Sequence, residues 1–318
     1  MPIAIERGLV MLVQVGITNY KSIDERIVLS MLATKESRHP NVVRLVSDIQ
    51  LLPVALIVGP NGAGKSNLFQ ALQHVQDMIL NTKHVQHIPH HLNQGTDTNI
   101  DIQVMIQGKR YAYGISYNAE RIQGEYLTVF HDDTPMIIFE RESDTVTLHH
   151  QQLTLPPFQS AVYYLSQSDV EAIRLFHQYI KETLIVALID EEIEQEEVAT
   201  LLKQPQLFEQ VSTLISRLEI GIDGLILDDK TVYVKYHSLQ LPIDQESTGT
   251  KRLIYLLTVI CDALQSGKVI LIDELERNLH TNLTTTIIKL FNSSLTNTEN
   301  AQLICSSHNT HLLDLNLL

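Results

Sequence analysis

A glycine-rich segment constrains this chain more than any other feature. Residues 59 to 66 read Gly-Pro-Asn-Gly-Ala-Gly-Lys-Ser and follow an apolar run at 54–58. A buried strand that runs into a glycine turn and then into a helix can wrap several backbone N–H groups around one anion. Glycine allows the positive φ angles that such a turn requires. The segment therefore predicts a phosphate-binding loop between a strand at 54–58 and a helix at 67–80.

The polar residues of this segment have distinct expected roles. We expect Lys65 to reach the terminal phosphates of a nucleotide and the Ser66 hydroxyl to bind Mg²⁺, which makes ATP and Mg²⁺ the expected cofactors. The positions expected to bind the nucleotide are Gly59, Asn61, Gly62, Ala63, Gly64, Lys65, Ser66 and Asn67. The alternative is a glycine turn without a ligand.

Composition narrows the class of protein. The 318 residues suit one large or two modest domains, and 44% of them are hydrophobic, enough for a substantial core. We see neither an apolar run of bilayer length nor a charged-then-apolar leader, so we expect a cytoplasmic protein without a membrane partner. The net charge of −14 disfavours a broad electrostatic grip on nucleic acid, whose binding stays an open question. Cys261 and Cys305 are interpreted as reduced core residues.

Hydrophobic periodicity divides the chain. Strands are predicted at 11–17 and 26–32, separated by a turn, and alternation at 100–106 and 111–117 predicts an antiparallel sheet. From residue 168 the period becomes helical, with Ile173, Phe176, Ile180 and Leu184 on one stripe. The expected regions are an N-terminal part of the nucleotide core at 11–80, an antiparallel β lobe at 98–150, a helical lobe at 168–220 and a C-terminal part of the core at 245–318.

Two carboxylates follow a second buried strand. Val269 to Ile272 is wholly apolar and is followed directly by Asp273 and Glu274. At such a position Asp273 can hold Mg²⁺ through its water shell. Glu274 suits a base that orients or deprotonates the attacking water. The alternative is an ordinary acidic surface at a strand end.

The order of motifs resembles a known family. The segments that carry this resemblance are 246–253 (Glu-Ser-Thr-Gly-Thr-Lys-Arg-Leu), 272–280 (Ile-Asp-Glu-Leu-Glu-Arg-Asn-Leu-His), 307–310 (Ser-His-Asn-Thr), 109–113 and 139–142. From Met11 to the C-terminus the chain resembles the ABC-type ATPase core in its soluble RecF/SMC/OLD-like branch. It resembles more closely the bacterial AAA-type ATP-binding proteins often encoded in phage-defence islands. The resemblance implies an α/β fold: a P-loop NTPase with an ABC-type core, an antiparallel β lobe and an inserted helical lobe.

The resemblance also implies roles for further residues. Ser247 and Gly249 match the ABC signature that contacts the γ-phosphate of ATP held by the other subunit, which implies a head-to-tail homodimer around two ATP molecules. His308 matches the switch histidine that touches the γ-phosphate. Lys21 matches a basic position near the nucleotide, and Gln167 is the candidate for the glutamine that helps to hold Mg²⁺.

Two departures and several functional alternatives remain. Thr248 replaces the signature glycine of transporter ABC domains, and their following glutamine is missing, which argues against a transporter subunit. Relatives continue well beyond the switch histidine, so nuclease-type functions stay open.

The expected function is the ATPase component of a bacterial anti-phage or toxin-type system. The alternatives are a nucleotide-gated module that controls a nuclease or toxin partner, and a RecF/SMC-like DNA-repair ATPase.

The histidines at 84, 87, 90 and 91 could in principle hold a metal. We interpret them as part of a loop, because Pro89 breaks any helix there and neither a cysteine nor a carboxylate completes the set.

Overall fold

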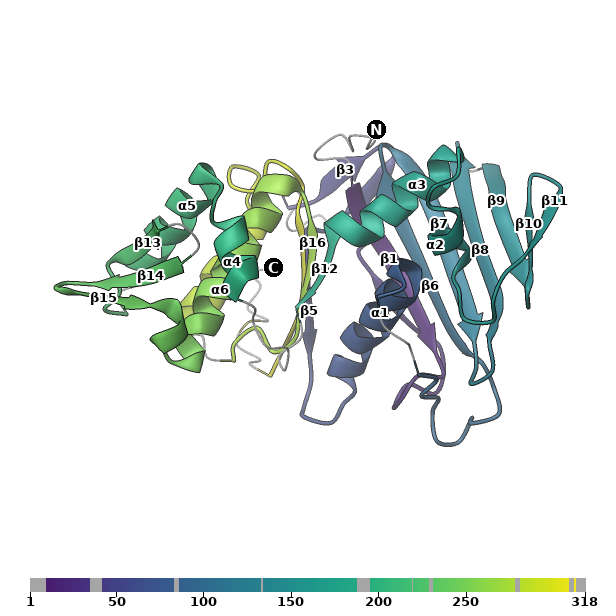
Figure 1. The fold of residues 1–318 in the computed structure, drawn as a ribbon, viewed down its shortest axis with the longest axis horizontal. Coiled ribbons are helices and arrows are strands. Elements are labelled where there is room, and N and C mark those ends of the chain that lie inside the picture. The colour runs from purple at the N-terminus through teal and green to yellow at the C-terminus, as the bar shows by residue number, and fades with distance from the viewer. Residues whose placement is uncertain are drawn as a thin grey trace.

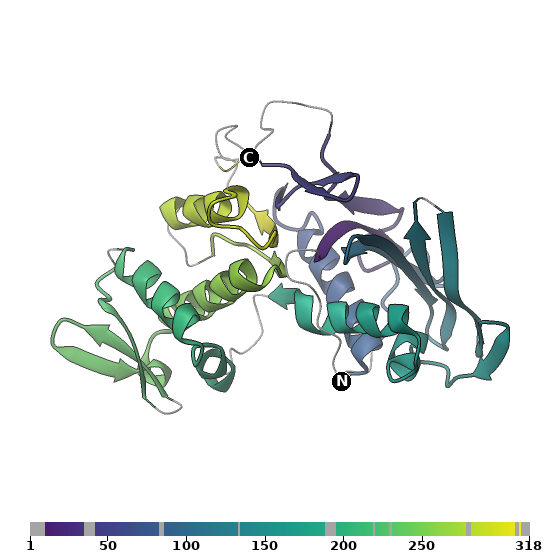
Figure 2. The same ribbon diagram turned by 90° about the horizontal axis from the view of Figure 1, so that it is seen from above.

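The described part of the protein has two main sheets, with helices between and beside them, and two smaller sheets. The computed structural model describes residues 10–34, 42–82, 86–132, 134–187, 195–218, 220–228, 231–277, 281–308 and 312. A large antiparallel sheet occupies the right half of Figure 1, and a parallel sheet stands in the middle. A smaller antiparallel sheet and several helices form the left half, and the view from above in Figure 2 shows the same order.

The large sheet has eight strands in the order β11-β10-β9-β8-β7-β6-β1-β2, and every pair is antiparallel. These strands are β1 (Val10–Thr18), β2 (Ile27–Ser30), β6 (Thr98–Ile106), β7 (Lys109–Tyr117), β8 (Ile122–His131), β9 (Thr134–Glu142), β10 (Thr145–Leu148) and β11 (Gln151–Thr154). The alternation at 100–106 and 111–117 forms the predicted antiparallel sheet. Because β1 pairs with β6, this sheet is continuous across the expected boundary between 11–80 and 98–150. The division into domains stays a prediction.

The parallel sheet separates two hydrophobic cores. Its order is β12 (Leu184–Ala187), β16 (Val269–Ile272), β17 (Gln302–Ser307) and β5 (Val54–Val58). Val269 and Leu271 of β16 pack into one core, and the alternate residues Ile270 and Ile272 pack into the other. A parallel sheet covered on both faces reads as an unbroken apolar run, which is the pattern of 54–58 and 269–272.

Different helices cover the two faces. Helix α1 (Lys65–Leu80), α2 (Ala161–Leu165) and α3 (Glu171–Gln178) lie between the two main sheets (Figures 1 and 2). The other face is covered by α6 (Thr248–Ser266) and α7 (Thr281–Asn292), whose apolar residues share a core with that face. Beyond them lie α4 (Gln195–Leu201), α5 (Pro205–Ser216), β13 (Gly224–Asp228), β14 (Thr231–Tyr236) and β15 (Leu239–Pro242). The described residues also contain a hairpin of β3 (Arg44–Val46) and β4 (Ile49–Leu51) and a 3₁₀ turn, η2 (Ile243–Gln245).

One residue of the predicted helical stripe lies elsewhere. Ile173 and Phe176 are buried in α3, and Ile180 is buried in the π-helical turn η1 (Tyr179–Thr183). Leu184, however, is the first residue of β12 and pairs with Val269 of β16, so its assignment to a helix was wrong. The run Leu-Ile-Val-Ala at 184–187 is short, apolar and partly β-branched, so pairing with β16 outweighs the helical period.

Both cysteines lie in the core that covers the α6 and α7 face of the parallel sheet. Cys261 in α6 and Cys305 in β17 are buried and free. Burial raises the pKa of each thiol to about 12, so both are neutral at physiological pH. Their predicted place in the core is confirmed.

A buried ion pair joins the large sheet to the chain that follows it. Arg141 and Glu125 are fully buried and 3.7 Å apart. The Arg141 guanidinium also donates to the carbonyls of Ser143, Pro156 and Gln159. Glu125 accepts from the Ser160 hydroxyl at 2.7 Å and from the Ala161 N–H at 2.8 Å. The carboxylate thereby holds the N-terminus of α2 against the sheet.

Replacing Arg141 by Met should lower the free energy of unfolding by about 3–5 kcal/mol, because it leaves the buried Glu125 carboxylate without its cationic partner. The measurement is urea unfolding followed by circular dichroism. Arg121→Met is the matched control: Arg121 pairs with Asp144 where both side chains are more than a third exposed, so it should cost less than about 1 kcal/mol. Equal losses in the two variants would contradict this assignment.

Candidate functional site

The carboxyl ends of three parallel strands meet at one edge of the central sheet. Val58 at the end of β5 pairs with Ser307 of β17, and Cys305 of β17 pairs with Ile272 of β16. The chain leaves these strands as the glycine loop, as His308 and as the Asp273-Glu274 pair. This edge therefore collects the groups that the sequence predicts to act together, and it is the candidate functional site.

The glycine loop has the geometry of an anion cradle. Gly62 and Gly64 have φ angles of 79° and 87°, a conformation that favours glycine. Gly64 precedes the first residue of α1, Lys65, and the first turn of this helix carries no acidic side chain. The helix begins two residues earlier than predicted and ends at Leu80, as predicted. Its N–H groups and dipole favour an anion at this end.

Lys65 lies inside the cradle. Its ammonium group donates to the carbonyl of Gly59 at 2.7 Å and to that of Pro60 at 2.9 Å. It also lies 3.2 Å from Nδ1 of His308. The lysine predicted to hold phosphate is therefore attached to the loop and adjacent to the predicted switch histidine.

His308 lies between Lys65 and Glu274. Its Nε2 is 3.2 Å from Oε1 of Glu274, and the two side chains are about one-third exposed, at 33% and 31%. Its backbone N–H donates to the Glu276 carboxylate, a contact that the sequence did not predict. Nδ1 of His308 also lies 3.0 Å from the carbonyl oxygen of Gly59, so the imidazole contacts the glycine loop as well as Lys65 and Glu274.

Ser306 links the two acidic residues that follow β16, through the side chain of Asp273 and the backbone of Glu274. Asp273 is 4% exposed and accepts from the Ser306 hydroxyl at 2.5 Å. The same hydroxyl accepts from the backbone N–H of Glu274 at 2.7 Å. Glu274 has a φ of 47°, so the chain turns sharply after Asp273, and the two side chains face different surroundings. Sequence reasoning missed Ser306, whose only signal is a hydroxyl at the end of an apolar strand.

Lys21 lies beside α1. The turn after β1 places Lys21 in the left-handed region, with a φ of 52°, and its ammonium group donates to Gln70 at 2.5 Å. Partial burial lowers the pKa of Lys21. Gln70 is one helical turn beyond Ser66, so Lys21 lies near the cradle and is anchored to the helix that begins there.

The signature residues form a second helix N-terminus. Ser247 caps α6, and its hydroxyl accepts from the Thr250 N–H at 3.2 Å. Ser247 is exposed, and a Cβ added at Gly249 would have only Ser247 within 4 Å. Among the described residues, no hydrogen bond joins this helix start to the glycine loop of the same chain. Its exposure leaves it accessible to a second molecule.

The remaining residues singled out in the sequence are Gln167, the rest of the family motifs and the histidines of the loop. Gln167 is exposed in the turn between α2 and α3, and its expected contact with Mg²⁺ stays a prediction. The motif residues Asn278, Leu279, His280, Asn309 and Thr310 lie outside the described residues. His87, His90 and His91 occupy the predicted loop, and the described residues contain no cluster of metal-ligand type. His84 lies outside the described residues.

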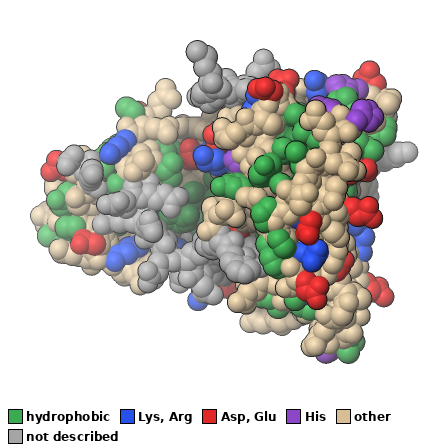
Figure 3. Space-filling model, turned by 45° about the vertical axis from the view of Figure 1, so that its right-hand side comes forward, with side chains coloured by type: hydrophobic (Ala, Val, Ile, Leu, Met, Phe, Trp, Pro, Cys, Tyr) green, Lys and Arg blue, Asp and Glu red, His purple; other side chains and the backbone are tan. Residues whose placement is uncertain are grey.

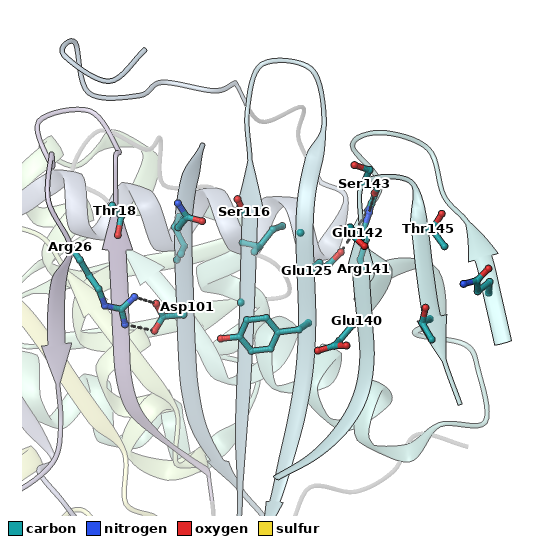
Figure 4. Close-up of a pocket in the computed structure, with 18 residues that line it drawn as sticks. Thr18, Arg26, Asp101, Ser116, Glu125, Glu140, Arg141, Glu142, Ser143 and Thr145 are labelled. Carbon is teal, nitrogen blue, oxygen red and sulfur yellow. Dashed lines mark hydrogen bonds and ion pairs between the residues drawn. The ribbon is translucent and has the colours of Figure 1, made fainter. Parts of the chain in front are cut away.

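A broad groove of 1110 Å³ covers the outer face of the large sheet and does not include the candidate site. Figure 4 shows the polar side chains that line this groove, among them the Arg26–Asp101 ion pair. The pair covers Gly16, and the ring of Tyr126 covers Gly114. Bulkier neighbours thus shield these glycines, and the groove is the solvent face of a sheet.

A family profile described as "AAA domain, putative AbiEii toxin, Type IV TA system" matches residues 54–314. The chain belongs to this family. The AAA-type family predicted from the sequence is thereby confirmed. The sequence matches no curated protein.

Solved structures of SMC heads are similar in fold. The head domain from Pyrococcus furiosus, with an extended coiled coil and bound to the C-terminal domain of ScpA, has a TM-score of 0.54 at 11% identity, covering 96% of this chain and 91% of that one. An SMC head bound to the C-winged helix domain of ScpA has a TM-score of 0.49 at 11% identity, covering 94% and 90%. The SMC head from Thermotoga maritima has 0.43 at 13% identity, covering 95% and 91%. The predicted fold class, an α/β P-loop NTPase fold with an ABC-type core and an antiparallel β lobe, is confirmed.

Replacing Ser306 by Ala should lower the free energy of unfolding by about 1–3 kcal/mol, because the buried Asp273 carboxylate and the Glu274 N–H both lose a partner. The measurement is urea unfolding. Ser216→Ala is the control, since the Ser216 hydroxyl donates to Thr213 on an exposed part of α5 and should contribute less than about 0.5 kcal/mol. A Ser306→Ala variant as stable as the wild type would remove this hydroxyl from the support of the site.

Proposed function

We propose that this protein binds MgATP at the carboxyl edge of its parallel sheet and hydrolyses it. The observation that carries the proposal is the meeting of Lys65, Glu274 and His308 beside a glycine loop at a helix N-terminus. The residues present fit a magnesium-bound triphosphate: N–H donors and an ammonium group face the anion, and a hydroxyl and a buried carboxylate suit the metal. The family and the fold support ATP binding and hydrolysis.

Each residue has a stated part in this chemistry. Gly59, Asn61, Gly62, Ala63, Gly64 and Asn67 would surround the phosphates, and Lys65 would balance charge on the terminal phosphate. Ser66 and Asp273, with Gln167, would hold Mg²⁺. Glu274 would accept the proton of the attacking water, and His308 beside it would hold the orientation of that carboxylate. Lys21 would add positive charge near the loop.

A second copy of the chain would complete the site. Ser247 and Gly249 present an exposed helix start that suits the γ-phosphate of ATP bound by the partner. A head-to-tail homodimer with two ATP molecules between its subunits follows from this arrangement. Hydrolysis would then open the dimer.

We further propose a toxin-type or anti-phage role in the cytoplasm, with a nuclease or toxin as effector partner, and the family description, which names a putative toxin of a type IV TA system, supports the toxin-type part. Among the described residues, no helix is long and apolar enough to cross a membrane. On the face drawn in Figure 3 the described lysines and arginines are scattered singly. With a net charge of −14, this distribution gives little support to a DNA-repair ATPase that grips DNA.

Replacing Glu274 by Gln should keep MgATP binding and reduce the steady-state rate of phosphate release at least about a hundredfold, since the amide cannot accept the proton. Sedimentation should show this variant accumulating as a dimer when MgATP is present. Glu140→Gln, an exposed substitution of the same kind on the large sheet, is the control and should retain wild-type turnover.

Unchanged phosphate release by Glu274→Gln would remove this residue from the mechanism. Wild-type protein that binds MgATP tightly but releases almost no phosphate, with or without DNA, would contradict the hydrolase and favour a nucleotide-gated module.

A further inference from the structure

Three consecutive residues of the turn after β1 are each hydrogen-bonded to a side chain of α1. The bonds join Tyr20 to His74 (2.8 Å), Lys21 to Gln70 (2.5 Å) and Ser22 to Asn67 (2.6 Å). The three helix partners are spaced by three and four residues, so they lie on one face of α1. The turn therefore runs along the first turns of α1 in the opposite chain direction.

This turn also contacts the glycine loop. A Cβ added at Gly64 would lie 2.8 Å from the Ser22 hydroxyl, closer than a methyl group can approach. Asn67, the partner of Ser22, is itself one of the predicted nucleotide-binding positions and lies in the first turn of α1. A displacement of the turn would therefore move the end of the loop and the N–H groups that face the phosphates.

One buried side chain holds the turn in place. Asn19 is 2% exposed and has a φ of 54°, a conformation that asparagine tolerates better than most residues. The two N–H groups of its amide nitrogen are shared among the carbonyls of Asn93 (3.2 Å), Thr96 (2.9 Å) and Asp97 (3.2 Å) and the Thr96 hydroxyl (2.9 Å), and its amide oxygen accepts from the His90 N–H (2.8 Å). These partners all belong to the segment 86–97.

The backbone adds to the same attachment. The Lys21 N–H donates to the carbonyl of Ile88 at 2.8 Å, and the Thr98 hydroxyl donates to the carbonyl of Asn19 at 2.6 Å. The segment 86–97, part of which the sequence predicts to be a loop, thus supports the turn independently of α1.

We propose that Asn19 is a positioning residue for the nucleotide site. It holds the turn at 20–22 against α1. The turn, once held there, fixes the positions of Asn67 and Gly64 at the proposed phosphate site. Asn19 does not touch the nucleotide. The proposal rests on the proposed binding of MgATP and makes the segment 86–97 a part of the nucleotide-binding unit.

Asn19→Asp tests the proposal most directly. The aspartate keeps the size, the acceptor oxygen and the tolerance of positive φ, but it loses the donors to three carbonyls. We expect the dissociation constant for MgATP, measured by isothermal titration calorimetry, to rise about tenfold, because a small misplacement of a binding group is costly. Ser22→Ala removes only an exposed hydroxyl and its bond to Asn67, and it should shift the constant in the same direction without loss of thermal stability.

Asn297→Asp is the matched control. Asn297 is 1% exposed, donates to the carbonyls of Phe291 and Ala301 and accepts from the Ala301 N–H, so it holds a loop in the way that Asn19 does. That loop precedes β17 and lies at the opposite edge of the parallel sheet. Asn297→Asp should lose stability and bind MgATP as the wild type does.

The outcomes separate cleanly. Weaker MgATP binding by both Asn19→Asp and Ser22→Ala, with normal binding by Asn297→Asp, supports the proposal. If Asn19→Asp does not fold, the affinity of Ser22→Ala alone decides between support and rejection. Wild-type affinity in Ser22→Ala and in folded Asn19→Asp overturns it and leaves Asn19 a purely structural residue. Wild-type protein that does not bind MgATP would instead overturn the proposed function on which the inference rests.

Discussion

Parallel pairing of β5, β17 and β16 is the constraint on which the site depends. Residues as distant in sequence as Val58, Ile272 and Ser307 end their strands at one edge, because parallel neighbours share a direction. The register is held from both faces, since alternate residues of β16 belong to two different hydrophobic cores. A slip of one residue would exchange these faces and expose each core to the wrong side chains. The site geometry is therefore fixed by packing that lies well away from it.

Hydrogen bonds then fix the side chains at this edge relative to one another. Lys65, His308 and Glu274 form one connected line, and Ser306 joins the Glu274 backbone to the Asp273 carboxylate. Each member is held by a neighbour from a different strand or loop. A second support reaches the loop from the other side, through the turn at 20–22 that lies along α1. The groups that would meet a triphosphate are thus positioned before it arrives, which is the condition for effective charge stabilisation.

The sequence predicted those parts of the fold that local pattern encodes. The strand at 54–58, the glycine turn and the alternation of β6 and β7 follow from residue type and spacing alone. The helical stripe failed at Leu184, because a short apolar run has no period of its own and takes the structure of its neighbour, here β16. Ser306, Glu276 and Asn19 were missed as supporting residues, since their partners lie far along the chain and only the folded structure reveals them. The proposed role of Ser247 and Gly249 depends on a second molecule, which a single chain cannot supply.

Titration of the full chain with ATP in the presence and absence of Mg²⁺, for the wild type and Lys65→Ala, tests the central claim most directly. The account predicts saturable, Mg²⁺-dependent binding by the wild type and loss of measurable affinity in Lys65→Ala. Lys289→Ala, an exposed substitution on α7, should bind as the wild type does. Absence of binding by the wild type, or unchanged affinity in Lys65→Ala, would contradict the account.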